Sequence, residues 1–181
     1  MQKALVGVLL VCIAWGGRLQ AQSNGSAAFD KLRALGGEWE GTLTWSGARS
    51  STGRMDAQYY TTGNGSAVVE NLISDGTPVM TSVYHLDGPD LRVTHFCGAQ
   101  NQPRLKATAF NPDNSQITFS FVDITNLRSP TAGHVDGLEL RFLAPDHITV
   151  RFRFVGDGKQ SDELIDLRRK KSSSLAATPN G

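Results

Sequence analysis

The chain has 181 residues, of which 39% are hydrophobic and 19% charged, and this suits one domain with a sizeable core. Residues 22–167 contain 12 basic and 17 acidic residues, so this part has a net charge of −5. Basic residues cluster only beyond it, at 168–171. An acidic body without a basic stripe excludes the usual kind of nucleic-acid-binding surface.

Residues 1–21 have the pattern of an export signal. Lys3 supplies a positive start, residues 4–15 form an apolar run, and residues 19–21 (Leu-Gln-Ala) are typical of a signal-peptidase site. The apolar run is shorter than the roughly 20 residues of a membrane span. We therefore expect cleavage near Ala21, export to the periplasm or the medium, and no transmembrane segment.

A short helix is expected before the main body of the fold. Ser26 can cap its start, and Gly36 and Gly37 can end it. Phe29, Leu32 and Leu35 recur every third residue, which gives the helix one apolar face. A helix of this length is not stable alone, so we expect it to lie against a larger body.

From Glu38 onward the apolar residues alternate with a period of two, which predicts strands. Turn residues separate about ten such runs, at residues 39–45, 54–61, 66–73, 79–86, 91–97, 104–110, 116–123, 137–143, 147–155 and 162–168. The pattern predicts an all-β domain over residues 22–169, an antiparallel up-and-down barrel whose closure removes exposed edges. The Ser-rich residues 170–181 predict a disordered tail.

The clearest candidate site lies in the hairpin formed by residues 79–97. In the simplest register Tyr84 is opposite Val93 and Ser82 is opposite His95, so these side chains share one face. That face is uncharged apart from the histidine, and we expect it to point inward. His95, Tyr84 and Ser82 would then form a polar patch on an apolar wall, whereas a slip of one residue would reverse the faces.

A buried histidine beside a tyrosine can bind a ligand, act as a base or simply complete the core. Glu70 lies in an apolar run; if it points inward it needs a partner, such as Arg104 or His95. The amide-rich segment containing Asn101, Gln102 and Arg104 can line the barrel rim and bind a polar headgroup. We count these residues as candidate ligand-binding residues and expect no metal site.

The helix followed by Gly37-Glu38-Trp39 resembles the start of a calycin barrel, the group of lipocalins, fatty-acid-binding proteins and nitrobindins. In lipocalins a basic residue of the last strand covers this tryptophan, and the resemblance implies that Arg168 or Arg169 does so here. The runs 66–70, 83–88 and 94–104 are similar to uncharacterised exported bacterial proteins with a lipocalin-like domain, a family without a settled activity.

Nitrobindins have further glycines after the tryptophan and bind haem through a histidine late in the chain. Here Leu43 and Trp45 replace those glycines, and the late histidines, His134 and His147, lack the matching context. We therefore expect neither haem nor another cofactor.

Three hypotheses about function follow. The first is a non-enzymatic exported barrel that binds a small lipophilic ligand in its interior. The second is a packed structural or interaction module of the cell envelope. The third is an enzyme that uses His95, with Tyr84 or Glu70, in the barrel mouth. The oligomeric state stays open.

Overall fold

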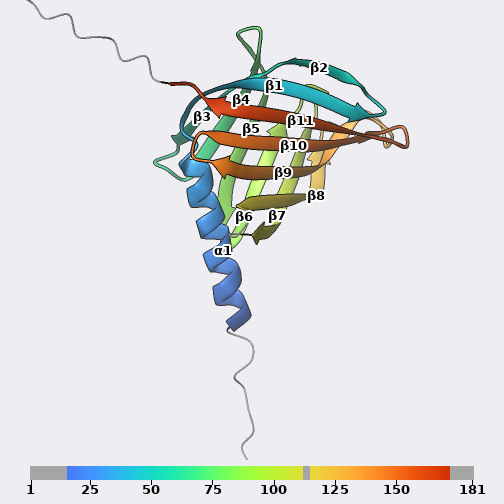
Figure 1. The fold of residues 1–181 in the computed structure, drawn as a ribbon. Coiled ribbons are helices and arrows are strands. Elements are labelled where there is room, and N and C mark those ends of the chain that lie inside the picture. Colours follow the sequence, from blue (N-terminus) through green and yellow to red (C-terminus); the bar gives the residue numbers. More distant parts are fainter. Residues whose placement is uncertain (1–15, 112–114, 172–181) are drawn as a thin grey trace, which may run out of the picture.

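A computed structural model of the protein describes residues 16–111 and 115–171. A helix precedes a series of strands (Figure 1). The elements are α1 (Gly16–Arg33), β1 (Gly37–Gly47), β2 (Ser51–Arg54), β3 (Asp56–Thr62), β4 (Ala67–Ser74), β5 (Thr77–Asp87), β6 (Asp90–Phe96), β7 (Gln102–Asn111), β8 (Gln116–Thr125), β9 (His134–Ala144), β10 (His147–Gly156) and β11 (Lys159–Arg169).

The strands form a closed antiparallel barrel. From β3 to β11 each strand pairs with the next, and β11 pairs back to β1, which completes the ring. On its other side β1 pairs with β3 near Trp39 and with β2 near Trp45. Strands β2 and β3 therefore share one position, and the ring has ten strands, as the alternation predicted. The predicted strand at 54–61 is divided at Met55, whose backbone amide donates to the Gly41 carbonyl.

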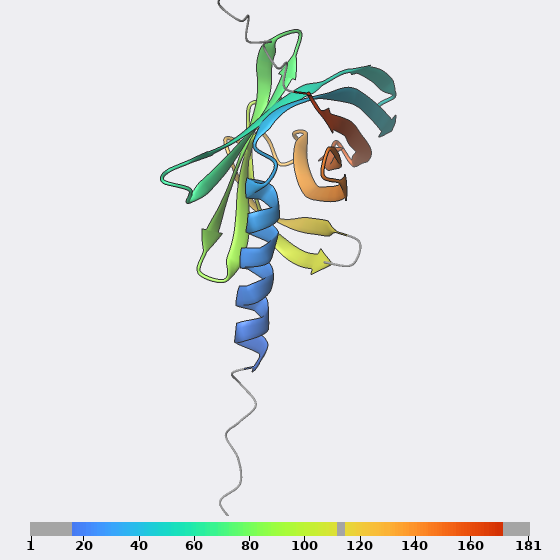
Figure 2. The ribbon, with the colours of Figure 1, turned by 60° about the vertical axis from the view of Figure 1, so that its left-hand side comes forward.

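The N-terminal helix covers one end of the barrel. It starts at Gly16 rather than at Ser26, since no proline interrupts residues 16–33. Its buried residues Ala28, Phe29 and Leu32 belong to the same core as the strands. Figures 1 and 2 show α1 against β5, β6 and β7, while its first half extends beyond them. Within the described residues no helix is both long and apolar enough to cross a bilayer.

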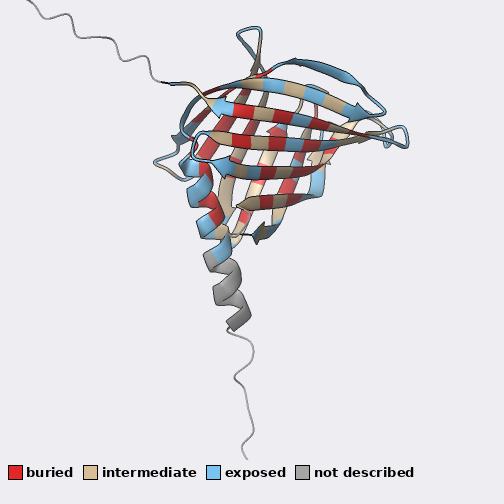
Figure 3. Cartoon of the chain, viewed as in Figure 1, coloured by how far each residue is buried: buried red, intermediate tan, exposed pale blue. Residues whose placement is uncertain are grey.

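Burial alternates along the strands, so that every second residue points into the barrel (Figure 3). Phe121 is an exception: it lies two residues after the buried Phe119, but it is 37% exposed. Pairing of β8 with β9 ends at Ser120 and Gly137, so Phe121 has no strand beside it on that side. A bulge between β7 and β8 also shifts the register next to it.

Arg169 covers Trp39, as the lipocalin resemblance implied. Its guanidinium carbon lies 4.4 Å from the centre of the indole ring. The indole Nε1 donates to the Leu35 carbonyl at 2.9 Å. Gly37 has a φ of +126°, a conformation that favours glycine, and an added Cβ would lie 3.1 Å from Arg169 Nη1. The Gly-x-Trp element therefore joins the helix end to the closing strand.

The chain stays attached to the barrel just past β11. The backbone amide of Lys170 donates to the Glu38 carbonyl, and its ammonium pairs with Asp56 at 2.9 Å. Most of the predicted tail, residues 172–181, lies outside the described residues, as do residues 1–15 of the predicted signal.

Candidate functional site

A row of buried polar side chains crosses four neighbouring strands. Tyr59 of β3 is opposite Glu70 of β4, Glu70 is opposite Ser82 of β5, and Ser82 is opposite His95 of β6. Tyr84 is opposite Val93, so the hairpin has the register expected from the sequence. All five polar residues are essentially inaccessible to solvent. The alternation of each strand thus brings them together inside the barrel.

Two tyrosines hold the carboxyl group of Glu70. Tyr59 OH donates to Oε1 at 2.5 Å, and Tyr84 OH donates to Oε2 at 3.1 Å. Burial raises the pKa of Glu70, and these hydrogen bonds oppose that rise. Neither Arg104 nor His95, the expected partners, contacts it. Tyr59 was not predicted, although Ala57 and Tyr59 alternate with exposed or half-buried neighbours.

His95 is held at one ring nitrogen only. Its Nδ1 forms a 2.9 Å hydrogen bond with Ser82 Oγ, and its ring lies 4.7 Å from the Phe152 ring. Nε2 is buried and has no hydrogen-bond partner within the described residues. Burial lowers the pKa of His95 from 6.5 to about 4, so the imidazole is neutral at pH 7.

The segment expected at the barrel rim has a different role in the fold. Arg104 points outward and pairs with Asp123. Gln102 accepts a hydrogen bond from Thr125 at 2.9 Å. Asn101 is buried and its Nδ2 donates to the Gly133 carbonyl at 2.9 Å. These contacts join the start of β7 to the end of β8 and to the β8–β9 connection, and none of them reaches the His95 group.

The end of the barrel away from α1 contains a cavity, called here the distal cavity. Its volume is about 220 Å³. It is lined by mostly apolar or small residues from several strand ends and loops: Trp45, Arg49, Met80, Cys97, Gly98, Ala99, Val135, Phe154 and Glu163. Burial raises the pKa of the Cys97 thiol, which fits a packing role more than a reactive one.

Glu163 is the buried acid of this cavity. It is 4% exposed, and no hydrogen bond to its carboxyl group is formed within the described residues. Burial raises its pKa from 4.5 to about 7; the positive charge of Arg49 opposes the rise, and the carboxyl of Glu70 adds to it. The alternation of Glu163, Ile165 and Leu167 on β11 was a signal that it points inward.

Arg49 lies over two aromatic rings at the same place. Its guanidinium carbon is 4.1 Å from the centre of the Phe154 ring and 4.7 Å from that of Trp45. The two rings meet edge to face at 6.0 Å. The Arg49 backbone amide donates to Ser161 Oγ at 3.1 Å, which fixes the β1–β2 connection above β11. The side chain of Arg49 takes part in none of the ion pairs of the described residues.

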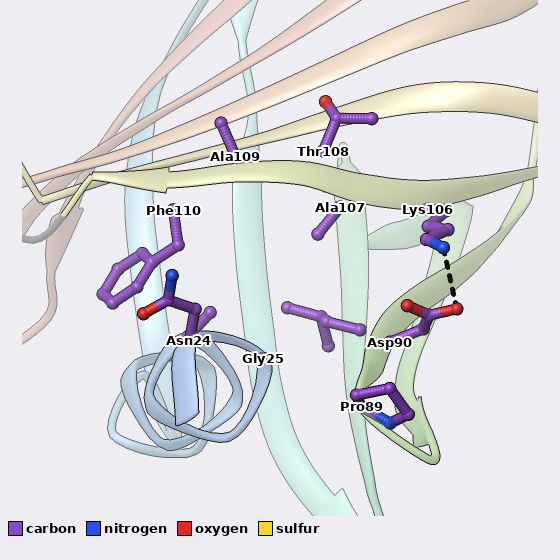
Figure 4. Close-up of a pocket in the computed structure, with 11 residues that line it drawn as sticks. Asn24, Gly25, Pro89, Asp90, Lys106, Ala107, Thr108, Ala109 and Phe110 are labelled. Atoms are coloured by element: carbon purple, nitrogen blue, oxygen red, sulfur yellow. Dashed lines mark ion pairs between the residues drawn. The ribbon is translucent and has the colours of Figure 1, made fainter. Parts of the chain in front are cut away.

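A second, larger cavity lies between α1 and strands β6 and β7 (Figure 4). Its volume is about 470 Å³. It forms because β6 and β7 pair only over residues 92–94 and 104–106, so the strands separate beside the helix. Lys106 and Asp90 form a 2.8 Å ion pair at its edge. Small residues line it, including Gly25, Ala28 and Ala107, and it does not reach the buried polar row.

The histidines and acids of the described residues are spread over the barrel. Within residues 24–111 and 115–171 no three His, Cys, Asp or Glu side chains lie together as metal ligands would. His134 Nδ1 is hydrogen-bonded to the Ala132 carbonyl, and His147 Nε2 to Asp166 Oδ1, each at 2.9 Å. Among the described histidines only His95 is fully buried, and its Nε2 has no hydrogen-bond partner within these residues.

No family model matches the sequence, and no curated protein is similar to it. Solved structures do resemble the fold. The protein Rv2717c from M. tuberculosis has 17% identity and a TM-score of 0.51, covering 80% of this chain and 98% of that one. A protein of unknown function from the DUF3598 family of Nostoc punctiforme has 14% identity and a TM-score of 0.53, covering 77% of this chain and 49% of that one. These similarities show the barrel fold alone.

Proposed function

We propose that this protein is a non-enzymatic barrel that binds a small lipophilic ligand in the distal cavity. The main observation in support is that the mostly apolar lining of this cavity contains one acid, Glu163. Glu163 is 4% exposed, and its carboxyl group accepts no hydrogen bond within the described residues. Its oxygens are not among the fully buried, unpartnered atoms of the described residues, so a ligand or water in the cavity can reach them. A few polar groups on apolar walls are the usual make-up of a ligand site.

The size of the cavity limits the ligand. An apolar cavity of about 150 Å³ is large enough for benzene. The distal cavity, at about 220 Å³, therefore suits one ring or a short branched chain. A long acyl chain would not fit inside, because aromatic pairs such as Tyr84 with Phe119 and His95 with Phe152 occupy the barrel below. The ligand is therefore either small enough to fit inside the distal cavity or long and inserted into it by one end only.

Benzyl alcohol is a suitable neutral probe. We expect amide chemical-shift changes around Trp45, Val135 and Phe154 when it is titrated into ¹⁵N-labelled protein. Val135→Phe would fill the cavity and abolish these changes. Val122→Phe adds the same ring at an exposed position and should bind as the wild type does. Shift changes that persist in Val135→Phe, or changes confined to other regions, would reject the distal cavity as the site.

A packed structural module is the second candidate. It is favoured by the ring contacts that fill the centre of the barrel, between Tyr84 and Phe119 and between His95 and Phe152. A complete absence of probe binding in the titration above would favour it over ligand binding. The catalytic hypothesis has less support, because His95 is wholly buried and does not line the distal cavity.

Export is part of the proposal and is supported by the sequence of residues 1–21. Cleavage near Ala21 would cut within α1 and leave the residues that pack on the barrel, Ala28, Phe29 and Leu32. Expression of the full chain in a bacterial host, followed by fractionation and N-terminal sequencing, tests this. We expect a product that starts near Gln22 in the periplasm or medium; an uncleaved cytoplasmic product would refute it.

A further inference from the structure

The aromatic pair of the distal cavity already holds a cation. Arg49 comes from the exposed β1–β2 connection, and its guanidinium rests on the faces of Trp45 and Phe154. A cation within about 6 Å of an aromatic centroid is attracted by the negative face of the ring. The chain thereby shows what kind of group this pair of rings accepts.

We propose that the ligand is a small organic cation, an ammonium or guanidinium group on an apolar body, which displaces Arg49 from the two rings. This inference rests on the proposed binding function and names its ligand class. The cationic group would keep the ring contacts that Arg49 now makes, and the apolar body would occupy the cavity. Glu163 would accept the hydrogen bonds that the cation donates.

The charges around the cavity favour a cation over an anion. Glu163 lines the cavity, and the carboxyl group of Glu70 raises the pKa of Glu163. An anionic ligand would add a third negative group to this region, whereas a cation would relieve the repulsion. Arg49 is the one nearby positive group that acts on Glu163, and its side chain is on the solvent side. Swinging outward would cost it the two ring contacts and its attraction to Glu163, interactions that the cation of the ligand would replace.

The binding should depend on pH through Glu163. The charged groups that act on it are Arg49 from the β1–β2 connection and Glu70 from β4. Glu163 in turn raises the pKa of Cys97, which follows β6. Glu163 ionises near pH 7, while an alkylammonium, like that of lysine, stays charged up to about pH 10. Affinity for a cation should therefore rise between pH 6 and pH 8, and affinity for a neutral ligand of the same shape should not.

Three probes of similar size test the inference: benzylamine, benzyl alcohol and benzoate, titrated at pH 8 and followed by Trp fluorescence and calorimetry. We expect benzylamine to bind at least about tenfold more tightly than benzyl alcohol, a modest ratio for a cation between two rings and a carboxylate. Benzoate should bind most weakly. Arg49→Ala should strengthen benzylamine binding, because the rings no longer have to release the arginine.

Glu163→Gln is the decisive variant, and Asp162→Asn, on the opposite face of β11, is its matched control. Glu163→Gln should bind benzylamine little more tightly than benzyl alcohol, with its affinity for benzyl alcohol unchanged. Asp162→Asn should bind both probes as the wild type does. Equal or tighter binding of benzyl alcohol or benzoate by the wild type would overturn the cation inference and leave the proposed function standing. Binding of none of the three probes would overturn both.

Discussion

Arg169 and Trp39 meet face to face where the last strand closes against the first. Besides covering the indole, the Arg169 guanidinium donates to the carbonyls of Ala34, Leu35 and Gly36, at 2.9, 3.3 and 2.5 Å. These carbonyls follow the last residue of α1 and have no helical partner of their own. One side chain thus joins the helix end, the first strand and the last strand.

The first prediction concerns this contact. Arg169→Lys keeps the charge but loses the planar group that stacks on Trp39 and binds three carbonyls at once. We expect the free energy of unfolding to fall by about 1–3 kcal/mol. Chemical denaturation followed by Trp fluorescence measures this. Arg168→Lys, at the neighbouring exposed position, is the control; equal stability of the two variants would contradict the role given to Arg169.

The second prediction concerns the buried carboxyl of Glu70. Tyr59→Phe removes one of its two tyrosine hydrogen bonds and leaves the ring in place. Because Glu70 is fully buried, water cannot replace the lost donor, and we expect a loss of about 1–3 kcal/mol. Tyr60→Phe makes the same chemical change at a position that is 43% exposed. Thermal unfolding of both should show a clear fall in Tm only for Tyr59→Phe.

The third prediction is a pH dependence that arises from Glu163. Its folded pKa, about 7, is above the ordinary 4.5, so the folded state binds more protons than the unfolded state between these values. Its contribution to stability is fully present below about pH 4.5 and is lost as the pH rises through 7. Glu163→Gln should therefore become more stable relative to wild type, by on the order of 3 kcal/mol, between pH 4.5 and pH 8. Urea denaturation across this range would reveal it, and a constant difference would count against a buried acid.

The fourth prediction has the opposite sign and concerns His95. Its folded pKa, about 4, is below the ordinary 6.5, so the unfolded state binds more protons as the pH falls. The wild type should lose stability from this group between pH 6.5 and pH 4, by on the order of 3 kcal/mol. His95→Gln should remove this loss, so that its stability relative to wild type improves on acidification. A stability difference between the variant and the wild type that does not change with pH would contradict a buried, neutral His95.

The fold was largely predictable, because the alternation of apolar residues is local information. The ten-stranded ring, the hairpin register that sets Ser82 opposite His95, and the inward direction of Tyr84 all follow from it. The start of α1 and the division of one strand at Met55 were not predicted. The division depends on the hydrogen bond from the Met55 amide to the Gly41 carbonyl, a contact that the segment alone does not report.

The sequence by itself determined that strands follow the helix and which face of the hairpin at residues 79–97 points inward, because alternation is a local pattern. Only the tertiary structure decided which residues meet: Glu70 with Tyr59 rather than Arg104, Asn101 with Gly133, and Glu163 with the ring pair under Arg49. The physical reason is that partners across the barrel depend on the register of every intervening strand and on the stagger at closure. That information is distributed over the whole chain and is present in no single motif.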